Sequence, residues 1–153
     1  MTRIIRAEEL LRQYATGERD FARVYVDGSD ELARANLSNV NLSKAVFADL
    51  LLEWVNLSGT NLWEANMGQD YLADANLRGA DLSGANLSWA TLDRADLTNA
   101  KLVDACLNST SMKKVNLTSA DLSGAEVDEG TYLKGAIFYN TIMPDGSIYT
   151  DNT

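Results

Sequence analysis

The sequence predicts an all-β solenoid, in which the chain winds through short strands joined by regular corners. A large apolar residue recurs at every fifth position from Leu32 to Val127, and most of these central residues are leucine. The residue two positions earlier is usually Ala, Val or Thr, and the two residues after each centre are mostly small, polar or charged. A period of five fits neither an α-helix nor a straight strand and therefore indicates a bend that repeats.

Each five-residue unit combines a short strand with a corner. Successive side chains of an extended chain point to opposite sides, so the central residue and the residue two positions before it face inward together. Gly, Ser, Asn and Asp in the next two positions suit a turn. If every corner bends in the same direction, the central residues form one column inside the coils. A small inward residue such as Ala85 then leaves room for a large one such as Leu87.

The irregular units indicate how many corners close one coil. The inward residue before the centre departs from Ala, Val and Thr at Asp30, Leu50 and Asp70, which are spaced by 20 in the sequence. Two unusual centres, Phe47 and Met67, are also spaced by 20. We therefore expect a coil period of 20, which corresponds to four units, and so four faces, in each coil.

The repeated unit resembles that of the pentapeptide-repeat proteins, whose pattern is A-[DN]-L-x-x. The matching units are Ala75-Asn76-Leu77, Ala80-Asp81-Leu82, Ala85-Asn86-Leu87 and Ala95-Asp96-Leu97. This resemblance implies a right-handed quadrilateral β-helix, which agrees with the spacing of 20. It covers residues 32–127 without interruption, and residues 20–143 if one extra residue is allowed in each of two places, Asp27–Glu31 and near Gly130.

The segments outside the repeat predict the two ends of the solenoid. Ala7, Leu10, Leu11 and Tyr14 have the spacing of one helical face, and Gly17 can end a helix. Because an open solenoid exposes its core, we expect this short α-helix to cap the first coil. Pro144-Asp145-Gly146 predicts a turn. The expected organisation is an N-terminal cap with a short helix at 1–19, a pentapeptide-repeat β-helix at 20–143 and a C-terminal turn and tail at 144–153.

Composition limits the kinds of function that fit this chain. The 153 residues carry a formal net charge of −9, which repels nucleic acid and anionic membranes. No apolar run approaches the length of a membrane span, and the first residues lack the pattern of a secretory signal. We therefore expect a cytoplasmic monomer with no direct nucleic-acid or membrane partner.

Catalytic machinery is not visible in the sequence. There is no histidine and a single cysteine, Cys106, so neither an activated nucleophile nor a zinc ligand set can be assembled from these residue types. We predict no catalytic residues, no metal and no cofactor, and hence a protein that is not an enzyme.

One side of the predicted coils has the character of a binding surface. We call it the first face, and its units are centred on Leu32, Leu52, Leu72, Leu92 and Met112. Its candidate partner patch consists of Leu51 and Tyr71, which point outward, with Trp54 and Trp89 at the flanking corners. Exposed apolar patches often mark partner sites. The alternatives are that the N-terminal helix covers Leu51 and Tyr71, or that the aromatic side chains only shield strand edges.

These observations favour a protein-interaction or scaffold module that presents a rigid solenoid face to an unidentified protein. Basic side chains continue along the same face at Arg94, Lys113, Lys114 and Lys134. A second hypothesis comes from the family resemblance, because some pentapeptide-repeat proteins imitate the shape and charge of DNA. In that case the acidic chain would act on a DNA-binding enzyme such as gyrase.

Overall fold

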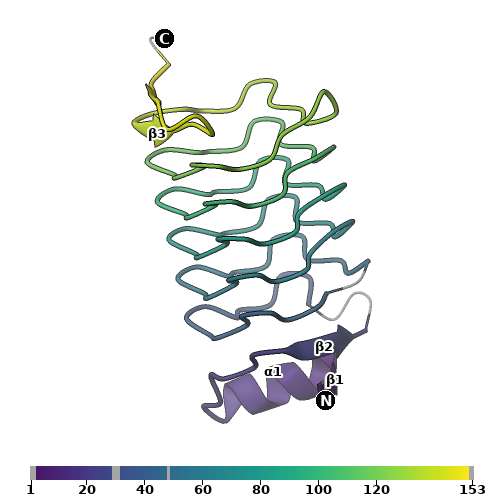
Figure 1. Cartoon of the computed structure of the whole chain (residues 1–153). Helices are drawn as coiled ribbons and strands as arrows, with labels where there is room; N and C mark the ends of the chain where they lie inside the picture. Colours follow the sequence, from purple (N-terminus) through teal and green to yellow (C-terminus); the bar gives the residue numbers. More distant parts are fainter. Residues whose placement is uncertain (1–2, 29–31, 48, 152–153) are drawn as a thin grey trace.

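The structure is a computed structural model that describes residues 3–28, 32–47 and 49–151. Within these ranges the named elements are β1 (Arg3–Arg6), α1 (Ala7–Ala15), β2 (Val24–Asp27), β3 (Thr141–Ile142) and β4 (Ile148–Tyr149). Between β2 and β3 the chain forms stacked coils that are joined by single-residue parallel bridges (Figure 1). The molecule is therefore a β-solenoid with short elements at its two ends.

The bridges between coils confirm the predicted period of 20. One continuous row joins Asn36, Asn56, Asn76, Asp96 and Asn116 in steps of 20. The bridges also show the two predicted insertions. The bridged residues Tyr25 and Val46, and likewise Ser111 and Tyr132, are separated by one position more than the usual 20. Asp30, one of the residues that indicated the period, lies outside the described residues.

The core is a column of central side chains inside the coils. From Leu37 to Leu117 every central residue is at most 1 % exposed. Each coil also bonds to its neighbours on both sides: the amide of Leu87 donates to Cys106 O at 2.9 Å, and the amide of Asn86 donates to Ala65 O at 2.9 Å. These bonds fix the coil spacing at about 4.8 Å, so the core cannot adjust its thickness freely.

Val127, the last centre of the uninterrupted run of repeats, does not lie in the core. It is 48 % exposed, although the five-residue pattern predicts that it points inward. After Met143 the chain turns back, with the amide of Gly146 donating to Met143 O at 2.9 Å. β4 then pairs antiparallel with β3, Thr141 opposite Tyr149, instead of adding a coil over Val127.

The N-terminal end contains the predicted helix and a strand that was not predicted. α1 buries Ala7 and Leu10, and its half-buried Leu11 and Tyr14 pack against the core. It ends at Ala15, with Thr16 as its C-cap, and Gly17 follows with a φ of +102°. β1 precedes the helix and pairs in parallel with β2, Arg3 beside Val24. Figure 1 shows α1, β1 and β2 together at the end of the stack opposite the C-terminus. No helix among the described residues has the length and apolar character needed to cross a bilayer.

Candidate protein interface on the first face

The first face is marked by one continuous row of outward side chains. Parallel bridges join Leu51 to Tyr71, and continue through Thr91 and Ser111 to Tyr132. Neighbouring positions in such a row are about 4.8 Å apart, so the side chains of Leu51 and Tyr71 are adjacent. Tyr71 is 48 % exposed and Leu51 is half-buried. The structure thus brings these two predicted patch residues together.

The two predicted tryptophans lie on opposite edges of this face. Trp54 follows the strand of Leu51 and is 51 % exposed, whereas Trp89 precedes the strand of Thr91 and is 69 % exposed. Two coil steps separate them along the row from residue 51 to residue 91. The two indole rings are therefore not in contact with each other. The row that contains Leu51 and Tyr71 lies between the two edges that carry them.

Both tryptophans occupy corner positions with a left-handed backbone. The φ angles are +57° at Trp54 and +63° at Trp89, a region that glycine adopts with the least strain. Other corners do carry glycine, for example Gly79 with a φ of +64°. Most other left-handed corners also carry a residue other than glycine, such as Asp74 and Arg94, so this backbone conformation is a general feature of the coils.

Charged side chains border the aromatic residues on one edge. The Arg34 guanidinium lies 4.4 Å from the centre of the Trp54 ring, a cation–π arrangement. Further along the same corner row, Arg94 donates two hydrogen bonds to Asp74, at 2.8 and 2.6 Å. These hydrogen bonds hold the pKa of the Asp74 carboxyl below its ordinary value.

The predicted basic stripe is therefore partly neutralised. Arg94 pairs with Asp74, and Lys113 Nζ lies 3.9 Å from Asp93 Oδ2. The two residues of each pair are 20 positions apart in the sequence, so they lie one above the other in successive coils. The side chains of Arg94 and Lys113 are each paired with an aspartate, which reduces the net positive charge of the stripe.

α1 contacts a different part of the coils from the predicted patch. The Tyr14 hydroxyl lies 3.4 Å from both Ser38 O and Ser38 Oγ, at a corner beyond the first face. With α1 in this place, the side chains of Trp54, Tyr71 and Trp89 are exposed to solvent.

Sequence reasoning missed several other exposed aromatic residues, and two of them have a lysine ammonium near the ring. Tyr132 ends the row of the first face, is 44 % exposed and has Lys113 Nζ at 5.3 Å from its ring centre. The extra residue near Gly130 obscured its place in that row. Trp63 is 41 % exposed but lies at a corner of the opposite face, with Lys44 Nζ 4.4 Å from its ring centre.

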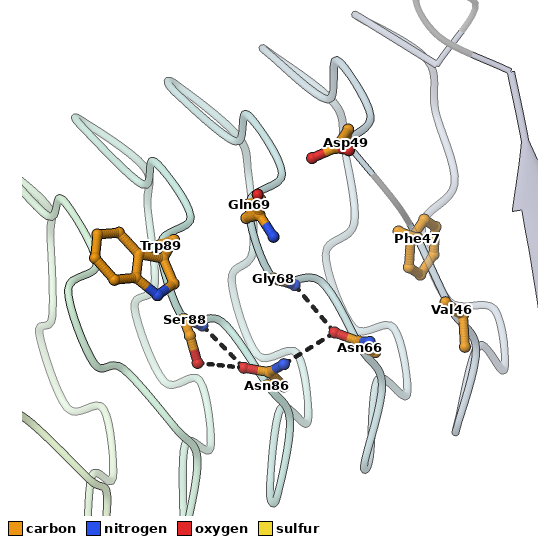
Figure 2. A pocket seen from close by; sticks show the side chains of 9 residues that line it. All are labelled: Val46, Phe47, Asp49, Asn66, Gly68, Gln69, Asn86, Ser88 and Trp89. Carbon is orange, nitrogen blue, oxygen red and sulfur yellow. Dashed lines mark hydrogen bonds between the residues drawn. The ribbon is translucent and has the colours of Figure 1, made fainter.

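A groove of about 240 Å³ lies beside Trp89 (Figure 2). Its polar groups bond mainly to one another: Asn86 Nδ2 donates to Asn66 Oδ1 at 3.0 Å, and the Ser88 amide donates to Asn86 Oδ1 at 3.0 Å. These bonds hold Asn66, Asn86 and Ser88 in one hydrogen-bonded network along the groove. Trp89 stands in the corner row of Asp49 and Gln69 at the edge of this groove (Figure 2).

Candidate metal ligands do not gather in the described ranges. No cluster of three or more Cys, Asp or Glu residues there is suited to hold a metal ion. Cys106 is half-buried, with its sulfur 3.2 Å from Ser88 Oγ. The candidate site therefore remains the aromatic first face.

The chain matches a known family by its sequence pattern. The profile described as pentapeptide repeats matches residues 71–108 and 95–128, with eight copies of the repeat. A search of curated proteins found none with significant similarity to this chain.

Solved structures with similarity to this chain include several pentapeptide-repeat proteins. HetL from the cyanobacterium Nostoc sp. strain PCC 7120, described as involved in heterocyst differentiation regulation, is 24 % identical, with 95 % of this chain and 100 % of that chain covered and a TM-score of 0.41. Rfr23 from the cyanobacterium Cyanothece 51142 is 27 % identical, with coverage of 86 % and 85 % and a TM-score of 0.37. A trypsin-treated form of QnrB1, described as a plasmid-mediated fluoroquinolone resistance protein, is 20 % identical, with coverage of 78 % and 60 % and a TM-score of 0.47.

Proposed function

The chain is a pentapeptide-repeat protein, and from this premise we propose that it is a non-enzymatic protein-interaction or scaffold module whose first face binds another protein. The observation that carries the proposal is the exposure of Trp54, Tyr71 and Trp89 on one side of the coils. Trp and Tyr are among the residues that most often dominate the binding energy of protein interfaces. Leu51 beside Tyr71 adds apolar area at the centre of the face.

The scaffold supports this role because it is already ordered before binding. Each strand of the first face bonds to the next coil: Leu52 N donates to Tyr71 O at 2.8 Å, and Leu72 N donates to Thr91 O at 2.7 Å. A partner that docks here therefore loses little free energy to ordering of the backbone. The side chains that would make contact need only fix their rotamers.

The hypothesis of a DNA mimic takes second place. The net charge of −9 favours it, because a DNA-binding enzyme such as gyrase has a surface that attracts anions. Several carboxylates along the coils are, however, paired with basic side chains, which interrupts a continuous negative surface. These pairs are Glu64 with Lys44, Asp74 with Arg94, Asp96 with Arg78, Asp93 with Lys113 and Asp81 with Lys101.

In this proposal the three parts of the chain have different roles. Residues 1–19 form the cap, in which α1 covers the first coil; residues 20–143 form a right-handed quadrilateral β-helix that carries the binding face; residues 144–153 form the closing turn and tail. The protein acts as a cytoplasmic monomer, without a cofactor or a metal, and its partner is a protein.

The proposal predicts that a double variant, Trp54→Ser with Tyr71→Ser, loses partner binding while it keeps its fold. Wild-type protein would be used to capture and identify the partner from the native lysate, and affinities would then be measured by calorimetry. Two interface anchors of this type contribute enough for the affinity to fall by about 100-fold or more. The thermal transition should change little, because both side chains are exposed.

Trp63→Ser is the matched control, because Trp63 has a similar exposure and lies on the opposite face. It should leave the affinity within a few-fold of wild type. Loss of binding in the Trp63 variant together with full binding in the double variant would contradict the proposal. A double variant that unfolds at much lower temperature would show instead that these side chains stabilise the coils.

A further inference from the structure

Asp70 places a carboxyl group inside the solenoid. It occupies an inward position at which most units carry Ala, Val or Thr, and its side chain is 0 % exposed. Its Oδ1 accepts a hydrogen bond from the Leu50 amide of the preceding coil at 2.8 Å. Its Oδ2 is also buried and has no hydrogen-bond partner. An ionised carboxylate in this place would be costly, because one donor does not compensate for the loss of water.

The Leu50 amide is bonded differently from its equivalents in other units. In the neighbouring units on the same chain, the corresponding amide donates to the carbonyl three residues earlier, as Ala45 does to Leu42 O at 3.0 Å and Val55 to Leu52 O at 3.1 Å. Leu50 instead donates across the coils to Asp70. The carboxyl therefore replaces a turn hydrogen bond with a bond between two coils.

Threonines at equivalent positions indicate which hydrogen bond the Oδ2 atom of Asp70 can form. Thr60 Oγ1 donates to Leu37 O at 2.9 Å, and Thr110 Oγ1 donates to Leu87 O at 2.7 Å, in each case 23 residues earlier. For residue 70 the corresponding acceptor is the carbonyl of Phe47. A neutral carboxylic acid has an O–H that can donate to such an acceptor, whereas a carboxylate has none.

The charges around Asp70 also favour the neutral acid. None of the ion pairs in the described part of the chain includes Asp70, and the charged group that acts on it is another carboxylate, that of Asp49. Burial raises the pKa of Asp70 to about 7, the Leu50 amide opposes this rise, and the charge of Asp49 adds to it.

We propose that Asp70 forms a proton-dependent link between two coils. As a neutral acid, its carboxyl group hydrogen-bonds the strand of Leu50 to its own strand, and ionisation of this group weakens the link. The neutral form accepts from the Leu50 amide at Oδ1 and donates from Oδ2–H toward the Phe47 carbonyl. Loss of the proton removes that donor and leaves a negative charge in the core.

The direction of the pH dependence follows from the number of bound protons. An unfolded chain releases the Asp70 proton at about pH 4, whereas the folded chain keeps it to higher pH. Between these two values the folded state holds one more proton, so the unfolding equilibrium constant rises by about tenfold for each pH unit. The stabilisation is complete at low pH, is lost as pH rises toward 7, and changes no further above the folded-state pKa.

The absence of histidine from the sequence makes this effect measurable. Other carboxyls with shifted pKa values, such as Asp74 and Asp96, titrate below their ordinary range and so do not interfere above pH 5. Urea unfolding of the whole chain would be measured from pH 5 to pH 8.5 for wild type, Asp70→Asn and Asp70→Thr. Asparagine keeps an acceptor and a donor without ionising, and threonine copies Thr60.

We expect the wild-type unfolding constant to rise by about 100-fold between pH 5 and pH 8, and those of both variants to change by less than about threefold. In parallel, the ¹³C shift of the Asp70 carboxyl in the wild type should titrate near neutral pH. Equal pH dependence in all three proteins would overturn the proposal. So would a carboxyl titration near pH 4, and this NMR result stands even if a variant fails to fold.

Discussion

Replacement of Leu87 by alanine should lower the free energy of unfolding by about 3–5 kcal/mol, the upper part of the range for buried leucines. Leu87 is 0 % exposed, and Met67 and Leu107, its neighbours in the column, are 0 % exposed as well. The cost of such a change depends on how far the surroundings can collapse into the cavity. Here the coils on both sides are held by backbone hydrogen bonds, so the cavity should remain open.

Urea unfolding followed by tyrosine and tryptophan fluorescence would measure this loss. Lys101→Ala is the control, since Lys101 is exposed on the same coil and its ammonium is 4.0 Å from Asp81. It should leave the unfolding midpoint nearly unchanged. A loss for Leu87→Ala below about 1 kcal/mol would mean that the coils move together more easily than their hydrogen bonds imply.

Replacement of Leu10 by alanine should lower the free energy of unfolding by about 2–5 kcal/mol. Leu10 is 0 % exposed and belongs to the same apolar cluster as the coils, so α1 is attached to the core through it. If α1 caps the solenoid, its loosening also uncovers apolar side chains and strand edges of the first coil. Exposed edges of this kind promote association between chains.

Two measurements follow from this: the unfolding midpoint, and the apparent mass by light scattering. The variant should show a lower midpoint and self-association at high concentration. Arg12→Ala changes the exposed side of the same helix and should show neither effect. A Leu10 variant that is as stable and as monodisperse as wild type would contradict a capping role for α1.

The fold of the repeat region could be predicted from the sequence because the five-residue period alone decides which side chains face inward. The spacing of Leu50 from Asp70 and of Phe47 from Met67 gave the coil length, and the bridges have the same step of 20. β1 escaped prediction because four residues, of which only Ile5 is buried, give no period to recognise. Val127 follows the pattern, but its exposure depends on where the chain turns back.

The candidate site was predictable in position but not in detail. The register of the coils predicted that Leu51 lies beside Tyr71 and that Trp54 and Trp89 lie at the two flanking corners of the face. The pairing of Arg94 with Asp74 and of Lys113 with Asp93 had a signal in the sequence, because the members of each pair are separated by one coil period. The sequence placed Asp70 at an inward position, but its protonation state depends on the extent of its burial and on the opposing hydrogen bond from the Leu50 amide, which the repeat pattern does not specify.

The central claim, that the first face binds a protein partner, can be tested most directly with the indole N–H signals of the three tryptophans in a ¹⁵N NMR spectrum. Trp54 and Trp89 border the first face and Trp63 lies on the opposite face, so one spectrum contains both the test and its control. When the captured partner is added, the signals of Trp54 and Trp89 should shift or broaden while that of Trp63 stays in place. A change at Trp63 with Trp54 and Trp89 unaffected would contradict the claim.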